Sequence, residues 1–400
     1  MPKFFIKSKL NIKKAHTYRQ AYNKIKKSNL FDEEFYLESY PHIKESNMDP
    51  LVHYLFHGYK ESKNPSEKFD NNFYLYKYPN VRESGVNPLV HYVLWGMGSN
   101  YEAFPIFPNY SNLNICLKGK KDYFFLVNDS NHELKQYFDF SFKSNFDSSN
   151  FREYFEVKRK FFEENNIKYF FFIVPDKSLV CKDYLPFQYN YINRNYNQIC
   201  DLFPDFINVL TETDYFKEDS HINYRGAKKL SYCYLNHFDN TLSSQDFENL
   251  LIDEVEVIRY LDLLFSKNWS YSEEERQKYD LKISCSTIKN KSLINLEDNI
   301  PEEFKECNGR KSIYYKNTNN INNLKALIFG DSFMVFLFDY MALYFKETFF
   351  YWDHLTLNEE LIKYYEPDII MEIRSERFLE NYNHPKWVKD KLVGNNNNEL

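Results

Sequence analysis

The serine of the tripeptide Gly330-Asp331-Ser332 stands where a nucleophile can be held. The apolar run KALIF precedes the tripeptide, and the long apolar segment FMVFLFDYMALYF follows it. This pattern predicts a strand, a tight turn and a helix. A serine at such a turn can attack a substrate if a nearby base takes its proton, but it can equally cap the helix. The tripeptide alone leaves both roles open.

Asp219 and His221 offer the acid and the base that such a serine needs. Residues two apart in an extended chain project from the same face, so Asp219 can meet the imidazole Nδ1 while Nε2 stays free for Ser332. These are the parts of a catalytic triad in the chain order Asp, His, Ser. An acid two residues before a histidine is also a common surface pattern, so the pair needs support from the rest of the chain.

Two other histidines compete for the role of base. His384 lies near the C-terminus in NYNHPKW, but Asn381 stands three residues before it in place of an acid. His354 follows a predicted strand in YWDHL and has the adjacent acid Asp353. We favour His221 over both.

Strands and helices alternate from about Leu117 onward. Apolar stretches predict strands at 122–128, 168–175, 325–330, 348–352 and 367–373, and periodic stretches predict helices at 148–166, 225–238, 244–269 and 333–347. This alternation predicts an α/β fold, a three-layer α/β/α domain whose mostly parallel sheet is covered on both faces. Ligands of such sheets bind at the carboxyl ends of the strands, where we expect Asn128, Pro175 and Gly330.

A tandem repeat precedes this domain. FDEEFYLESYPHIKESNMDPLVHYLFHG from Phe31 and FDNNFYLYKYPNVRESGVNPLVHYVLWG from Phe69 are identical at 15 of 28 positions. Each unit predicts two short helices, the first beginning at an aspartate and the second at an Asp-Pro or Asn-Pro pair. His53 and His91 recur in the second helix, and we interpret them as packing residues because no metal ligands repeat with them. The result is a small all-α module that resembles one found in bacterial polysaccharide-associated glycosyltransferases and in some secreted repeat proteins. In this chain we expect it to dock on a partner or to present a substrate.

Charge is unevenly distributed along the chain. The net charge is −6, yet residues 1–30 carry nine Lys and Arg residues and no acid. The acidic remainder argues against nucleic acid as a partner. The basic leader, with the repeats, predicts contact with an anionic membrane surface or a polysaccharide-assembly protein; a solvated, poorly ordered terminus is the alternative.

Membrane-spanning and secretory segments are not predicted. The start lacks the roughly 7 to 15 consecutive apolar residues of a signal peptide, so we expect a cytoplasmic protein, peripheral to the inner face of the cell membrane. The six cysteines are scattered without ligand spacing, which fits reduced thiols and predicts no metal.

Five sequence blocks resemble, in order, those of the alginate O-acetylation proteins within the SGNH hydrolase-like superfamily. The blocks are DYFFLVNDSN, NIKYFFFIVPDKSLVCKDYLP, EDSHINYRGA, ALIFGDSF and EPDIIMEIRSERFL. The resemblance covers about Leu117 to Glu380. It implies that Ser332 is the nucleophile, His221 the general base and Asp219 its orienting acid, with the Ser332 N–H binding the oxyanion and Asp331 holding the turn.

The same resemblance offers four further candidates for the oxyanion or a sugar hydroxyl, namely Asn128, Lys177, Arg374 and Arg377. Asn128 has a turn-capping alternative, and Arg377 a structural ion pair with Glu376. Ile222 departs from the family, which has tryptophan there, and this puts the substrate-facing wall in doubt.

We therefore expect an O-acyltransferase, most simply an O-acetyltransferase, that modifies sugar hydroxyls of a bacterial capsule or other surface polysaccharide. No bound cofactor is expected, and acetyl-CoA is the expected acyl donor. The alternatives are a deacetylase with the same triad, a transferase of another group such as a phosphoryl derivative, and a non-catalytic glycan-binding protein. The predicted parts are a basic leader at 1–30, repeats at 31–105, the catalytic domain at 112–390 with a helical insertion at 240–311, and a disordered tail at 391–400.

Overall fold

A computed structural model of the chain describes residues 12–46, 48–104, 107–113, 115–187, 189, 191–251, 254–259, 283–288, 292–319, 321–353 and 357–390. The chain divides into two units. Unit 1 runs to Pro108 and includes Phe138–Phe142 and Tyr189–Ile192; unit 2 holds the rest. The tail predicted at 391–400 lies outside the described residues.

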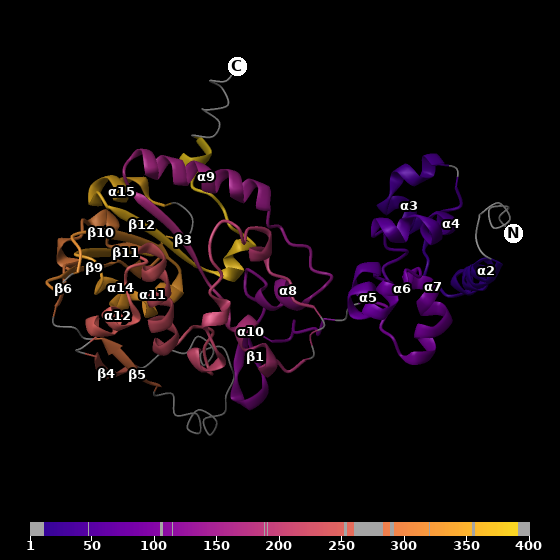
Figure 1. The fold of residues 1–400 in the computed structure, drawn as a ribbon, viewed down its shortest axis with the longest axis horizontal. Helices are drawn as coiled ribbons and strands as arrows, with labels where there is room; N and C mark the ends of the chain where they lie inside the picture. Colours follow the sequence, from indigo (N-terminus) through magenta and orange to yellow (C-terminus); the bar gives the residue numbers. More distant parts are fainter. Residues whose placement is uncertain are drawn as a thin grey trace, which may run out of the picture. The chain divides into compact units, whose positions relative to one another are not determined.

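Unit 1 is built from short helices that follow the two sequence repeats (Figure 1). Its elements are α2 (Ile12–Lys27), α3 (Glu33–Ser39), η1 (Pro41–Ser46), α4 (Pro50–Phe56), η2 (Gly58–Glu61), α5 (Asn71–Lys77), α6 (Pro79–Ser84), α7 (Pro88–His91), η3 (Tyr92–Gly96) and η4 (Met97–Ser99). The predicted N-caps are confirmed, since Asp32, Asp49, Asp70 and Asn87 each accept a backbone N–H three residues ahead. The Tyr-Pro break begins a further short helix, η1 or α6, in each repeat.

A tyrosine and a histidine join the two helices of each repeat. The hydroxyl of Tyr36 lies 3.0 Å from Nδ1 of His53, and that of Tyr74 lies 2.8 Å from Nδ1 of His91. The glycine after each second helix makes room for the tyrosine: a Cβ on Gly58 would lie 2.0 Å from the Tyr36 hydroxyl. The recurring histidines therefore have a structural role in holding the repeat together.

Unit 2 contains a six-stranded sheet in the order β3-β12-β10-β11-β9-β6. The strands are β3 (Lys168–Val174), β12 (Ile369–Ser375), β10 (Lys325–Gly330), β11 (Glu347–Tyr351), β9 (Ile313–Asn317) and β6 (Leu293–Asn295). The first four in this order are parallel, and β9 and β6 add antiparallel pairs at one edge. In β12 every residue is buried, because helices cover the sheet on both faces.

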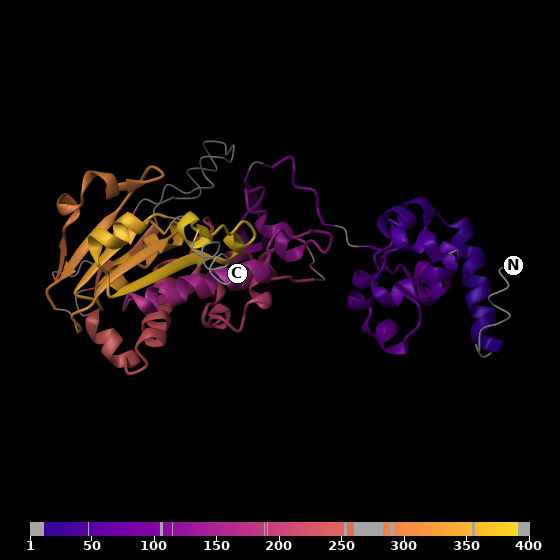
Figure 2. The same ribbon diagram turned by 90° about the horizontal axis from the view of Figure 1, so that it is seen from above.

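The covering helices complete the three-layer arrangement. Helices α9 (Ser148–Glu164) and α15 (Glu359–Tyr365) cover one face, and α11 (Tyr224–Phe238) and α14 (Phe338–Ala342) the other (Figures 1 and 2). Phe162 of α9 and Leu361 of α15 pack on Leu327 and Ile370 of the sheet, whereas Tyr234 of α11 stacks on Phe172. The predicted fold class, an α/β domain preceded by an all-α module, is confirmed.

Two local predictions are corrected by the structure. The strand predicted at 122–128 is present as β2 (Phe124–Leu126), but it pairs with β1 (Cys116–Lys118) in a separate two-stranded sheet and not in the main sheet. The single helix predicted at 333–347 is η12 (Ser332–Phe336) followed by α14. The segment 333–347 is apolar on nearly every side and has no single apolar stripe. Its sequence pattern therefore does not fix where the helix begins, and packing against the rest of the domain determines the helix boundaries.

The described part of the segment 240–311 is not simply helical, and its residues 252–253, 260–282 and 289–291, which include the end of the helix predicted at 244–269, lie outside the described residues. It contains α12 (Ser244–Leu250), and the chain then forms the antiparallel pair β4 (Glu254–Arg259) and β5 (Ile283–Ile288). A second pair follows, β7 (Glu306–Cys307) with β8 (Arg310–Lys311). Alternating β-branched residues in 254–259 favour a strand over the predicted continuation of the helix.

Candidate active site

Ser332 is held at the carboxyl end of β10, in the middle of the parallel sheet. Gly330 ends the strand where the chain is crowded: an added Cβ would lie 3.0 Å or less from Met334 atoms and 3.1 Å from the Ile373 carbonyl. Asp331 then caps η12, accepting the Phe333 N–H at 2.9 Å and the Ser375 N–H at 2.6 Å. Asp331 is fully buried and fixes the turn to β12, so Ser332 emerges at a defined point.

Asp219 and His221 lie in a short loop that Tyr215 and Ile222 close by pairing in antiparallel fashion. The Phe216 N–H donates to the His221 carbonyl at 3.2 Å, and Asn223 then caps α11. Ile222 is fully buried, so it belongs to the core of this loop and not to a substrate-facing wall. The loop therefore presents Asp219 and His221 directly before α11 begins.

The structure brings Ser332, His221 and Asp219 together. His221 Nε2 lies 2.7 Å from Ser332 Oγ, and His221 Nδ1 lies 2.5 Å from Asp219 Oδ1. Asp219 Oδ1 also accepts the backbone N–H of His221 at 2.9 Å, which fixes the carboxylate against its own loop. With Nδ1–H donated to the carboxylate, Nε2 is the basic nitrogen that faces the hydroxyl.

The surroundings keep this triad largely dry while leaving an approach to the serine. The Asp219 side chain is 6% exposed and that of His221 12%, whereas Ser332 is half-buried. The rings of Phe333 and Phe336 pack on the imidazole at centroid distances of 4.7 and 5.5 Å. Burial raises the pKa of Asp219 most, but the charge and hydrogen bonds of His221 outweigh it, so the net pKa is lowered and the carboxylate stays ionised.

Lys177 holds the backbone of the loop that carries Asp219. Its Nζ donates to three backbone carbonyls, those of Phe124 at 2.7 Å, Lys217 at 2.6 Å and Asp219 at 2.8 Å. The side chain is 1% exposed, and burial lowers the pKa of its ammonium to about 8. Lys177 thus holds the Asp219 loop on β2 and does not face a substrate.

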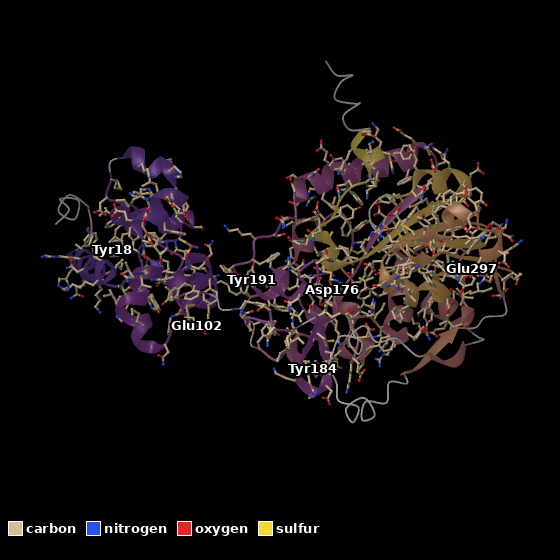
Figure 3. The ribbon with its side chains drawn as sticks, turned by 180° about the vertical axis from the view of Figure 1, so that it is seen from behind. Tyr18, Glu102, Asp176, Tyr184, Tyr191 and Glu297 are labelled. Carbon is tan, nitrogen blue, oxygen red and sulfur yellow. The ribbon has the colours of Figure 1, made fainter. Side chains whose placement is uncertain are left out.

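Arg377 packs against Phe333, the residue that follows Ser332. Its guanidinium pairs with Asp176, lies 3.5 Å from Glu133 Oε2 and stacks over the Phe333 ring at 5.5 Å. The expected pair with Glu376 is wrong, because Glu376 pairs with Arg194 at 2.6 Å. Asp176, in the interior of unit 2 (Figure 3), also accepts Tyr137 Oη and the Arg377 N–H, each at 2.7 Å.

Sequence reasoning missed Asp176 and Glu133. Asp176 is fully buried and Glu133 is 1% exposed. Burial, helped by the charge of Asp176, raises the pKa of Glu133 to about 8, although Arg377 opposes the shift. One sequence signal pointed to Asp176. It lies between a predicted buried strand and the candidate Lys177, within the block NIKYFFFIVPDKSLVCKDYLP.

Asn128 and Arg374 lie elsewhere. The Asn128 amide donates to the carbonyls of Tyr110 and Leu113, both at 2.8 Å, and its φ of +58° marks a turn. Arg374 is buried on β12, and its only ion pair among the described residues is with Glu372 at 3.5 Å. Among the described residues, its Nε and Nη1 have no hydrogen-bond partner. Within the described residues, neither side chain makes a hydrogen bond to Ser332.

Of the two rival bases, His384 is described, and it makes no hydrogen bond to Ser332. His384 is stacked on Tyr154 at 4.4 Å, and burial lowers the pKa of its imidazole to about 3. His354 lies outside the described residues. The Ser332 N–H, as the first of η12, has no acceptor within the helix.

No metal site competes with this chemistry in the part of the chain that the structure describes, where His, Cys, Asp and Glu form no group of three or more suited to a metal ion.

No family model matches the chain, and no curated protein matches its sequence. Among solved structures, Bacillus cereus PatB1 with a sulfonyl adduct is 18% identical, with 68% of this chain and 97% of that chain covered and a TM-score of 0.47. A DHHW family protein from Eubacterium siraeum is 15% identical, covering 68% and 100%, with a TM-score of 0.43. The O-acetyltransferase domain of Pseudomonas putida AlgJ is 12% identical, covering 69% and 98%, with a TM-score of 0.41.

Proposed function

We propose that the chain is an O-acyltransferase, most simply an O-acetyltransferase, that acts on sugar hydroxyls of a bacterial surface polysaccharide. The single observation that carries the acyl-transfer chemistry is the relay from Asp219 Oδ1 to His221 Nδ1 at 2.5 Å and from His221 Nε2 to Ser332 Oγ at 2.7 Å. The acetyl group and the sugar acceptor rest on the resemblance of the five sequence blocks.

The first half-reaction would load the serine. Ser332 Oγ attacks the acyl carbonyl while His221 Nε2 takes the hydroxyl proton, and Asp219 stabilises the imidazolium that forms. The Ser332 N–H donates to the developing oxyanion. The imidazolium then returns its proton to the leaving group, a thiolate if the donor is acetyl-CoA, and an acyl ester remains on Ser332.

The second half-reaction would transfer the acyl group from Ser332 to the acceptor. A sugar hydroxyl gives its proton to His221 Nε2 and attacks the acyl carbonyl, after which the proton returns to Ser332 Oγ as the ester bond to the enzyme breaks. Water in place of the sugar would make the same triad a deacetylase, so the acceptor decides between transfer and hydrolysis.

The test is to incubate the chain with acetyl-CoA and a capsule oligosaccharide and to measure the oligosaccharide by mass spectrometry. We expect a gain of one acetyl group that Ser332→Ala abolishes. Release of free acetate from an acetylated oligosaccharide, with no gain from acetyl-CoA, would overturn transfer in favour of hydrolysis.

A further inference from the structure

Helix α2 has two chemically different faces. Tyr18, Ala21, Tyr22 and Ile25 are buried in the core of unit 1, where Tyr18 is seen among its neighbours in Figure 3. The opposite side is exposed and carries Arg19, Lys24, Lys26 and Lys27, all cationic. The helix contains no acid to balance them. Because its apolar face is packed in the core of unit 1, the helix is held in place and its cationic side chains point away from that core.

Three of these cations lack anionic partners. Within the described residues none of Arg19, Lys24 and Lys27 takes part in an ion pair, although acids are abundant elsewhere in the chain. Lys24 makes one long contact, from Nζ to the Val93 carbonyl at 3.5 Å. Fixed and unpaired cations on one helix face favour an extended anionic partner over a single carboxylate.

Two exposed apolar side chains belong to the segment that α2 contacts. The contact of Lys24 with Val93 places α2 on η3, and Trp95 of η3 and Met97 directly after it are 51% and 53% exposed. Trp95 and Met97 lie only two residues apart, and exposed apolar side chains that occur together favour a surface that is covered in use. Tryptophan in particular favours the interface between water and lipid.

We infer that this face of unit 1, made by Arg19, Lys24, Lys27, Trp95 and Met97, docks on an anionic lipid surface. The cations match the negative headgroups, and the two apolar side chains enter the layer beneath them. A soluble polyanion would satisfy the cations but offers nothing apolar to Trp95 and Met97. Docking would be peripheral, since none of the described helices is long and apolar enough to cross a bilayer. This inference does not depend on the proposed chemistry.

The test is co-sedimentation of the full chain with vesicles. Vesicles of phosphatidylcholine with about one third phosphatidylglycerol should carry the chain down, and vesicles of phosphatidylcholine alone should not. The triple variant Arg19→Gln, Lys24→Gln, Lys27→Gln should bind about 100-fold more weakly, at roughly fivefold per cation. Trp95→Ala with Met97→Ala should bind about tenfold more weakly, with the residual binding lost in high salt.

A matched control removes three exposed cations elsewhere in unit 1, Lys44, Lys68 and Arg82, by the same change to glutamine. Circular dichroism checks that every variant is folded. Equal loss in the control would overturn the site, because net charge alone would then explain binding. Equal competition by soluble polyphosphate, with no effect of Trp95→Ala and Met97→Ala, would overturn the lipid assignment in favour of a polyanion.

Discussion

Asp176 and Lys177 are adjacent in sequence but support opposite halves of the triad. Lys177 binds the carbonyl of Asp219, and Asp176 binds Arg377, whose guanidinium covers Phe333 next to the serine. Buried charges of this kind are costly to leave unpaired, so each is held by several partners. We interpret both as positioning residues, since neither faces a substrate.

Replacing Lys177 by methionine tests this role. Three carbonyls lose their donor, and we expect a loss of about 3 kcal/mol of unfolding free energy, measured in urea. The freed Asp219 loop should also lower kcat by up to about 100-fold while KM changes little, because misplacing a catalytic group acts on the chemical step.

The matched control is Lys158→Met. Lys158 is equally buried, but its ammonium binds Glu372 at 2.7 Å and Tyr382 at 2.9 Å and not the triad. This variant should lose stability while keeping kcat per folded molecule. Equal losses of kcat in the two variants would contradict a positioning role for Lys177.

The pKa of Glu133 predicts a pH dependence of stability. Burial raises this pKa from 4.5 to about 8, so the folded chain binds more protons than the unfolded chain between these values. The contribution is therefore present below the unfolded pKa and lost as the pH rises through about 8. Glu133→Gln should flatten the fall of the urea midpoint from pH 5 to pH 8. An unchanged slope in Glu133→Gln, or the same flattening in the exposed control Glu163→Gln, would contradict it.

Among the helices of unit 1, the packing of each repeat depends on a glycine that leaves room for a tyrosine hydroxyl. Gly58→Ala should destabilise unit 1 by about 1–3 kcal/mol in urea unfolding, because the new Cβ overlaps the Tyr36 hydroxyl. The cost should be smaller in a Tyr36→Phe background, which removes that oxygen. Gly98→Ala, where a Cβ meets nothing within 4 Å, is the neutral control. A cost that is the same in both backgrounds would show that the hydroxyl is not the cause.

Local patterns predicted the elements that local chemistry determines. The caps at Asp32 and Asp70, and the buried strands β3, β10, β11 and β12, are read from residues a few positions apart. Partners distant in sequence were not predictable in this way. Strand β2 pairs with β1 and is not part of the main sheet. Arg377 pairs with Asp176, 201 residues away, and not with its neighbour Glu376.

The candidate site shows the same division. The spacing of Asp219 and His221 predicted which imidazole nitrogen meets the acid, and the two observed distances agree with it. The role of Lys177 could not be foreseen, because its ammonium binds the Phe124 carbonyl of β2, outside the main sheet. Asn128 lies in a turn, which was its alternative prediction. Ile222 is fully buried, and the triad geometry beside it is intact.

At the scale of the whole molecule, the triad belongs to one unit and the basic face to the other. All three triad residues lie in unit 2, whereas the repeats lie in unit 1. A chain lacking residues 1–105 should therefore keep its activity on a small ester within about twofold, because no triad contact is removed. A folded truncation, judged by circular dichroism, that has lost this activity would contradict the assignment of chemistry to unit 2.

The most direct measurement of the central claim is the acylation of Ser332 itself. The full chain is mixed with p-nitrophenyl acetate, quenched and mapped by peptide mass spectrometry, together with Ser332→Ala and His221→Ala. We predict a burst of p-nitrophenolate with an acetyl group on Ser332, and rates lower by about 10⁴-fold in each variant with no further loss in the double variant. An unmodified Ser332, or a burst that persists in Ser332→Ala, would contradict the account.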